Sequence, residues 1–159
     1  MNEKVKAFLA KKGYEDRLTE HKEVIDTVEH AAQQIGCSEA EIAKTLSFLV
    51  DGKPVLIVMA GDGKVNGGKF KAAFHTKPSM IQRDMVEELT GFRPGGVCPF
   101  GAKEGTEIWL DVSMKRFEKV YPAAGSEYSS AVFTLDELEK VTEAAGWLDV
   151  CKGWQEEEE

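Results

Sequence analysis

Residues 42–60 decide the fold, and they read IAKTLSFLV, then DGK, then PVLIVMA. Two runs rich in apolar and β-branched residues, 43–50 and 54–60, are separated by the short segment Asp51-Gly52-Lys53. This pattern predicts a β-hairpin with a glycine-containing loop. The second run is apolar without alternation, which indicates a strand covered on both faces. We therefore expect residues 55–59 at the centre of a sheet.

A lysine lies inside the first of these strands. Alternation along a regular strand places Lys44 on the same face as Leu46 and Phe48, which is the face expected to be buried. Lysine is almost never fully buried without a partner. Lys44 is therefore either a site residue or a lysine at a strand end whose ammonium reaches water along its own stem. This segment alone leaves both interpretations open.

A second distinctive stretch is the turn at residues 95–101, which reads GGVCPFG. Glycine leaves the backbone uncovered and permits positive φ angles. Pro99 restricts the conformation of the same loop. The turn is therefore a candidate for presenting backbone N–H groups to a ligand.

The rest of the chain predicts alternating short helices and strands. Helices are expected before Gly13, over 27–35 behind a carboxylate cap from Asp26, for one turn after Ser38, and over 68–74, 83–89, 113–117 and 134–146. Further strands are expected at 108–110, 119–121, 131–133 and 147–151. The order lacks strict βαβ alternation, so it favours an α+β fold, with a curved or barrel-like mixed β-sheet flanked by helices, over a doubly wound fold.

Length and composition limit the possible classes. With 159 residues, of which 42% are hydrophobic and 30% charged, the chain is expected to form one globular domain over 1–152 with an acidic tail over 153–159. The longest apolar run is too short to span a bilayer and the first residues lack a secretion signal, which predicts a cytoplasmic protein without a membrane partner. The net charge of -8 argues against a protein that binds long stretches of DNA or RNA. Contact with only the end of a nucleic acid stays open.

Cysteine and histidine patterns give no cofactor or metal site. The three cysteines, Cys37, Cys98 and Cys151, are odd in number and widely separated, which predicts free thiols. Cys98 lies in the glycine turn without a histidine near it in sequence, so a small buried cysteine is favoured over a nucleophile. Asp111 precedes an expected helix, where a cap is favoured over a role in orienting Lys44.

Several segments in order resemble the YbaK/ProX family of aminoacyl-tRNA deacylases, whose fold is also found as the editing domain of bacterial prolyl-tRNA synthetase. The resemblance rests on Glu20-His21, on residues 42–46, on Leu89-Thr90-Gly91-Phe92 running into 95–101, and on Ala123-Ala124-Gly125-Ser126. It covers roughly residues 15–150. It implies a compact domain with a mixed sheet and no cofactor, which hydrolyses the ester joining a wrongly attached amino acid to the terminal ribose of tRNA.

The resemblance also implies a set of site residues. Lys44 and Gly96 take the catalytic positions, and the implied substrate-binding residues are His21, Thr45, Gly95, Val97, Pro99, Gly101, Gly125 and Ser126. The implied partner is the acceptor end of an aminoacyl-tRNA, with a prolyl-tRNA synthetase as a second candidate.

The expected function is trans-editing of tRNA(Pro) that carries a small wrong amino acid such as Cys or Ala. Some editing enzymes for alanine have a histidine just after the glycine-serine pair, whereas this chain has Glu127-Tyr128-Ser129, so the amino acid stays open. The alternative is a non-catalytic module of the same fold that binds tRNA or a synthetase.

Overall fold

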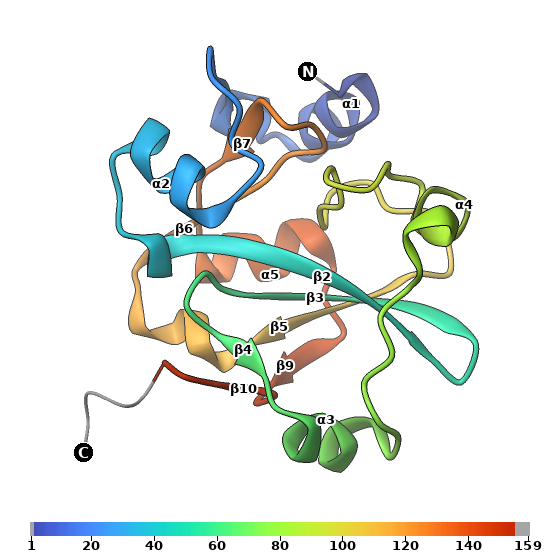
Figure 1. Cartoon of the computed structure of the whole chain (residues 1–159). Coiled ribbons are helices and arrows are strands. Elements are labelled where there is room, and N and C mark those ends of the chain that lie inside the picture. Colours follow the sequence, from blue (N-terminus) through green and yellow to red (C-terminus); the bar gives the residue numbers. More distant parts are fainter. Residues whose placement is uncertain (1, 155–159) are drawn as a thin grey trace.

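The computed structural model of the chain describes residues 2–154, which form a mixed six-stranded sheet with helices on both faces (Figure 1). The strand order is β8-β6-β2-β3-β5-β9. The bounds are β2 (Ile42–Val50), β3 (Lys53–Ala60), β5 (Glu107–Asp111), β6 (Lys119–Pro122), β8 (Phe133–Thr134) and β9 (Gly146–Leu148). Pairs β2–β3 and β6–β8 are antiparallel, and β2–β6, β3–β5 and β5–β9 are parallel. The sheet curls into a half-barrel, which confirms the predicted α+β fold.

Two small sheets lie outside this main sheet. β1 (Leu18–Glu20) pairs with β7 (Ser129–Ala131), and β4 (Lys64–Val65) pairs with β10 (Cys151–Lys152). The prediction of one strand over 131–133 was wrong, because the chain changes partner at Val132 and forms β7 and then β8. The prediction of one strand over 147–151 was wrong for the same reason, since β9 joins the main sheet and β10 joins β4.

The helices follow the predicted order, with corrected ends. They are α1 (Glu3–Lys12), α2 (Val28–Ile35), α3 (Gly67–Phe74), α4 (Val86–Thr90) and α5 (Leu135–Thr142), with 3-10 turns η1 (Glu15–Arg17), η2 (Glu39–Glu41), η3 (Arg83–Met85) and η4 (Val112–Arg116). Thr27, not Asp26, caps α2, because its hydroxyl accepts from the His30 N–H while the Asp26 carboxylate binds the His30 ring. α5 stops before Gly146, since Glu143 already takes the left-handed conformation with φ +52°.

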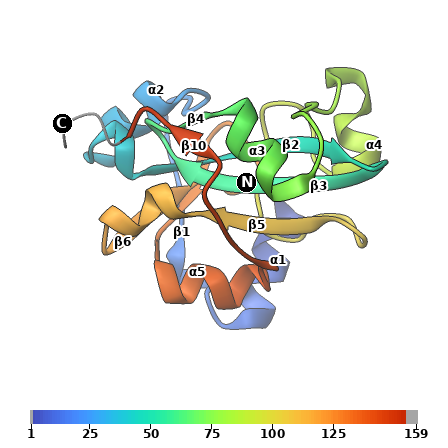
Figure 2. The same cartoon turned by 90° about the horizontal axis from the view of Figure 1, so that it is seen from below.

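The hairpin of β2 and β3 is the centre of the packing, as the sequence predicts. Val58 and Ala60 of β3 pack in the cluster that contains α1 and α5, whereas Ile57 and Met59 pack toward Phe70 of α3. Figure 2 shows α1 and α5 together on one side of the sheet. Every residue of β3 from Val55 to Ala60 is buried, so both of its faces are covered.

The division into one domain over 1–152 and a tail stays a prediction. Of the predicted tail, residues 155–159 lie outside the described part of the chain, and Gly153 and Trp154 follow β10. Within residues 2–154, no helix combines the length and the apolarity needed to cross a bilayer.

A two-point ion pair joins η1 to α5. Nη1 and Nη2 of Arg17 each lie 2.7 Å from a carboxylate oxygen of Glu137. The Arg17 guanidinium also lies over the rings of Tyr14 and Phe133, at 5.2 and 5.8 Å from their centroids. The hydrogen bonds from Arg17 lower the pKa of Glu137 to about 2.

We predict that Arg17→Ala lowers the free energy of unfolding by about 1 kcal/mol at pH 7, since bidentate pairs lie at the upper end of exposed ion pairs. The folded pKa of Glu137 lies below its unfolded value, so this stabilisation is complete above about pH 4.5 and is lost as the pH falls toward 2. Urea denaturation at pH 7 and pH 2.5 measures it. A deficit of equal size at both pH values would contradict the assignment.

Candidate functional site

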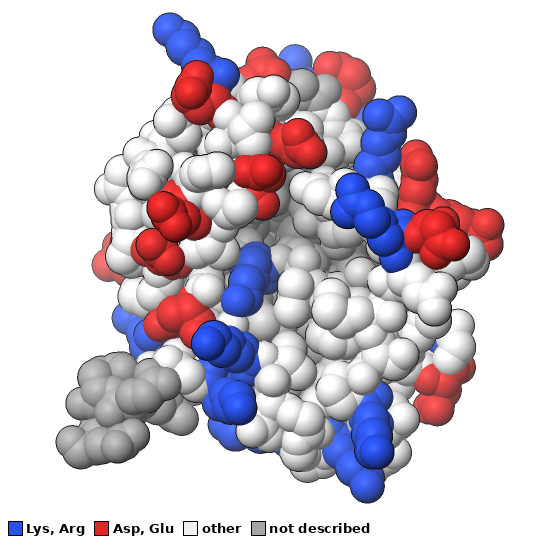
Figure 3. All heavy atoms as spheres, in the orientation of Figure 1, with Lys and Arg blue, Asp and Glu red and all other residues white. Residues whose placement is uncertain are grey.

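A cavity of about 360 Å³ opens beside β2. Its walls come from five parts of the chain, namely residues 25–35, which include α2, the first six residues of β2, residues 80–86, the loop at 94–97, and the 121–130 segment. Figure 3 shows the same face hollowed at its centre, with acidic side chains gathered on the side of α2. Its volume lies in the range of small-molecule sites.

The cavity exists because one edge of β2 is paired only near its two ends. At the start of the strand, Ile42 and Ala43 pair in parallel with β6. Further along, the Ser47 carbonyl accepts from the N–H of Ile81 at 3.1 Å, and the Leu49 N–H donates to Ser79 at 2.8 Å. Within residues 2–154, no strand pairs with the intervening residues 44–46 on this edge.

Thr45 is the residue whose backbone faces this gap. In an antiparallel pair the N–H and C=O of one residue point to the same edge, and they alternate along the strand. Ser47 and Leu49 point away from β3, so Thr45 does too. Its N–H and C=O therefore point into the cavity, where they can bind a ligand.

Lys44 lines the same cavity and lies on the face of β2 that the sequence predicts. Its register partner on β3 is Met59, which packs with Phe48 against α3. The ammonium does not extend freely into water, because Nζ lies 3.2 Å from the carbonyl oxygen of Gly61 and the residue is half-buried. Desolvation lowers the pKa of Lys44.

The turn that holds Lys44 was missed by the sequence analysis. The Gly61 N–H donates to the Ala40 carbonyl at 3.2 Å, and the preceding N–H of Ala60 donates to Ser113 Oγ at 3.1 Å. A Cβ at position 61 would lie 2.0 Å from the Glu39 carbonyl oxygen. Only glycine fits this close approach, so the position of the carbonyl that meets Lys44 is fixed.

The glycine turn divides between two cavities. Gly95 and Val97 line the cavity beside β2, and Gly95 has φ +88° with its backbone exposed. Gly96 faces the other way, where a Cβ would lie 3.0 Å from the Gly125 carbonyl oxygen. Gly96, Gly125 and Ser126 line a second cavity of about 600 Å³. The cavity beside β2 is thus lined by Lys44, Thr45, Gly95 and Val97. Gly96, Gly125 and Ser126 lie on the other side of the loop, at the second cavity.

Ser126 already has partners within its own turn. Its hydroxyl lies 2.8 Å from Ser129 Oγ and accepts from the Tyr128 N–H at 3.2 Å. Gly125 has φ +95° and its carbonyl accepts from the Asn2 side chain. These contacts are those of a tight turn between strands.

The remaining sequence-predicted residues lie outside the cavity beside β2. Pro99 and Gly101 line a third hollow, next to Phe8 of α1. His21 reaches the cavity only through Ser130, whose hydroxyl lies 2.8 Å from the His21 Nε2 and which itself lines the cavity. Desolvation lowers the pKa of His21, which favours the neutral form of its ring.

Two polar candidates have structural roles. Asp111 is fully buried, caps η4 by accepting from the Ser113 N–H, and also accepts from the Val150 N–H. Cys98 is fully buried, and desolvation raises its pKa to about 12. A thiol in that state is a poor nucleophile. Among residues 2–154, no group of three His, Cys, Asp or Glu side chains is placed to hold a metal ion.

Comparison with known proteins identifies the family. The sequence profile of the aminoacyl-tRNA editing domain matches residues 22–141. The chain belongs to this family. It is 45% identical over 142 residues to YwhH, an uncharacterized protein of Bacillus subtilis, covering 89% of this chain and 90% of that protein.

Further similarity connects the editing domain to proline-specific synthetases. A proline--tRNA ligase of Bacillus licheniformis is 31% identical over 96 residues, which are 60% of this chain and 17% of the ligase. A crystal structure provisionally described as a trans-editing enzyme for prolyl tRNA synthetase superposes with a TM-score of 0.86, 26% identity, and coverage of 95% of this chain and 96% of that one.

The cavity beside β2 is also lined by residues that the sequence analysis did not select. Those on α2 and on residues 80–86 include Val28, Ala31, Ile35, Met80, Ile81 and Arg83. The apolar stripe of α2 was a detectable signal, although it is also that of an ordinary core helix. Residues 80–86 carry no comparable pattern.

We predict that in the native protein at pH 8 the thiols of Cys98 and Cys151 fail to react with Ellman's reagent, while the half-buried Cys37 reacts slowly. Burial raises the pKa of Cys98 and of Cys151 to about 12 and also raises that of Cys37. All three thiols should react in 6 M guanidinium chloride, which serves as the control. Reaction of Cys98 as fast as that of Cys37 would show that the glycine turn is open.

Proposed function

We propose that the protein is a trans-editing aminoacyl-tRNA deacylase, which hydrolyses the ester of tRNA(Pro) carrying a small wrong amino acid such as Cys or Ala. The observation that carries the proposal is the cavity at the gap in the edge of β2. It combines the cation of Lys44, the backbone of Thr45 and the exposed turn at Gly95 in one space.

The groups around the cavity suit ester hydrolysis. The reaction needs a positioned water and donors for the charge that develops on the carbonyl oxygen. Thr45 supplies a backbone N–H, and the turn at Gly95 supplies an exposed backbone. The ester is already reactive, so positioning and modest electrostatic stabilisation are sufficient, and no nucleophilic side chain is needed.

Lys44 is assigned to the charged part of the substrate. Its ammonium has three N–H donors. One of them is used on the Gly61 carbonyl, which leaves two for the terminal phosphate or the ester oxygen. We treat it as an electrostatic anchor, since Lys44 lines the cavity and its Nζ is held in place by the Gly61 carbonyl.

The apolar wall of the cavity is where the amino acid is selected. Val28, Ile35 and Ile42 contribute to this wall. One methylene in such a pocket is worth only about 1–3 kcal/mol, so selection by size favours small side chains over large ones and separates near neighbours weakly.

Binding is proposed to involve the acceptor end of tRNA alone. The chain carries a net charge of -8, and acidic side chains lie beside the cavity in Figure 3. The phosphates of a long stretch of RNA would be repelled by this negative charge. Lys44 and Arg83 are the cations that line the cavity.

We predict that Lys44→Ala lowers kcat/KM for deacylation about 100-fold, the size typical for loss of one preorganised donor at a developing charge. Lys53→Ala is the matched control, because Lys53 lies on the same hairpin, is exposed and is remote from the cavity. Cys98→Ala should also keep its activity. The measurement is the release of amino acid from tRNA(Pro) charged with Cys, Ala or Pro, and from tRNAs of other specificity.

The outcomes separate the alternatives. No turnover of any substrate by the wild type, together with binding of the tRNA, would favour a non-catalytic binding module. Loss of activity in Cys98→Ala but not in Lys44→Ala would favour a thiol mechanism and reject the role given to Lys44.

A further inference from the structure

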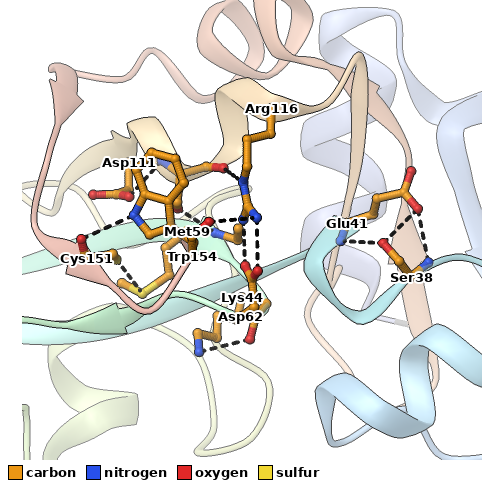
Figure 4. A network of polar contacts seen from close by, with 12 residues as sticks. Ser38, Glu41, Lys44, Met59, Asp62, Asp111, Arg116, Cys151 and Trp154 are labelled. Carbon is orange, nitrogen blue, oxygen red and sulfur yellow. Dashed lines mark hydrogen bonds and ion pairs between the residues drawn. The ribbon is translucent and has the colours of Figure 1, made fainter. Parts of the chain in front are cut away.

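An ion pair lies directly beside the turn that binds Lys44. Nη1 and Nη2 of Arg116 lie 3.0 and 2.6 Å from the two carboxylate oxygens of Asp62. Asp62 follows Gly61, whose carbonyl accepts from Lys44 Nζ. Figure 4 shows Lys44, Asp62 and Arg116 in one network of polar contacts.

Arg116 is itself fixed in place by several contacts. Its Nε donates to the Ser113 carbonyl at 2.9 Å, and Nη1 approaches the Trp154 carbonyl at 3.4 Å. Its guanidinium lies over the rings of Phe117 and Trp154, at 4.8 and 5.1 Å from their centroids. The planar fork is therefore preorganised for the carboxylate, so little side-chain entropy is lost when the pair forms.

The charged surroundings of Lys44 make this pair important. Besides desolvation, the ionisable groups among residues 2–154 whose charge affects the pKa of Lys44 are Cys151, Asp62 and Lys64. Cys151 has its pKa raised to about 12, so it is neutral at pH 7. Asp62 is then the anion that acts on the ammonium, and its carboxylate is turned toward Arg116.

We propose that Arg116 is a positioning residue for Lys44, because it holds the Asp62 carboxylate in a two-point pair and so keeps the Lys44 ammonium free of a carboxylate partner. The ammonium then donates one N–H to the Gly61 carbonyl, and its two other N–H groups are free to bind an anionic substrate group. Without Arg116, the Asp62 carboxylate becomes a competing internal anion for the same ammonium.

This inference rests on the proposed function in one part only, namely that the free N–H donors of Lys44 bind the substrate. The geometric part, that Arg116 and Lys44 compete for Asp62, can be measured without any substrate. The two parts are therefore tested by separate readouts.

The experiment uses the full chain and the variants Arg116→Met, Asp62→Asn and the double variant. Methionine keeps an unbranched apolar side chain against Trp154 and removes the charge. Arg17→Met is the matched control, because it breaks another two-point arginine–carboxylate pair of similar exposure, which lies outside the cavity. One readout is the pKa of Lys44 by NMR of ¹³C-methylated lysines, with Lys44→Arg for assignment, and the other is KM and kcat for deacylation.

In Arg116→Met we expect the pKa of Lys44 to rise, because a nearby unpaired carboxylate favours the charged form. We expect kcat/KM to fall about tenfold, mainly through KM, as for one pKa unit of added interaction. Asp62→Asn in the same chain should restore both values, and Arg17→Met should change neither. Arg116→Lys keeps a positive charge at Asp62, so its Lys44 pKa and its kcat/KM should lie between those of the wild type and of Arg116→Met. This variant is used in place of Arg116→Met if Arg116→Met does not fold.

Three results are decisive. An unchanged pKa of Lys44 in folded Arg116→Met would overturn the proposal. A loss of activity that the double variant does not restore would also overturn it, since Arg116 would then act on the fold and not through Asp62. The expected pKa pattern in a protein that deacylates no tRNA would support the positioning by Arg116 and reject the proposed function.

Discussion

The interrupted pairing along one edge of β2 is the constraint on which the site depends. On its other edge, the strand pairs with β3 over eight residues without a break. On the open edge, β6 covers the beginning and residues 79–81 cover the end, so the backbone of Thr45 is left between them. Buried backbone groups without a partner cost about 1–3 kcal/mol each, so such a gap persists in a fold only where water or a ligand satisfies it. Here the gap faces a cavity.

The central hairpin was predictable because its signals are local. Two β-branched runs around Asp51-Gly52 define both strands, and the uniformly apolar β3 indicates burial on both faces. The capping box at Ser38 was equally local, and the structure confirms it. The strands near the C-terminus were predicted less well because short segments such as β7, β8, β9 and β10 take their identity from distant partners. No sequence signal at Val132 predicts that the chain passes there from one sheet to another.

The candidate site also contains residues that local sequence predicts and residues that only the fold reveals. Alternation along β2 placed Lys44 on its observed face, which needs no knowledge of the rest of the fold. The glycine turn was recognised, but its φ angles decide which cavity each residue faces, and a sequence does not disclose them. Gly95, with φ +88°, lines the same cavity as Lys44, whereas Gly96 packs on the Gly125 backbone. The turn at Gly61 was missed for a similar reason, because the close approach to Glu39 is a long-range contact.

These features suggest a division of labour within the proposed reaction. Every aminoacyl-tRNA shares the ester, the terminal ribose and the phosphate, and these common parts meet the invariant chemistry of a strand edge and one lysine. The amino acid varies, and in this proposal it meets the side chains of α2, such as Val28 and Ile35, which can change without altering β2. An apolar wall rejects by size at about 1–3 kcal/mol per methylene, whereas a Thr45 N–H left without an acceptor penalises a ligand that lacks the ester. On this arrangement, recognition of the ester and selection of the amino acid reside on different elements and can evolve separately.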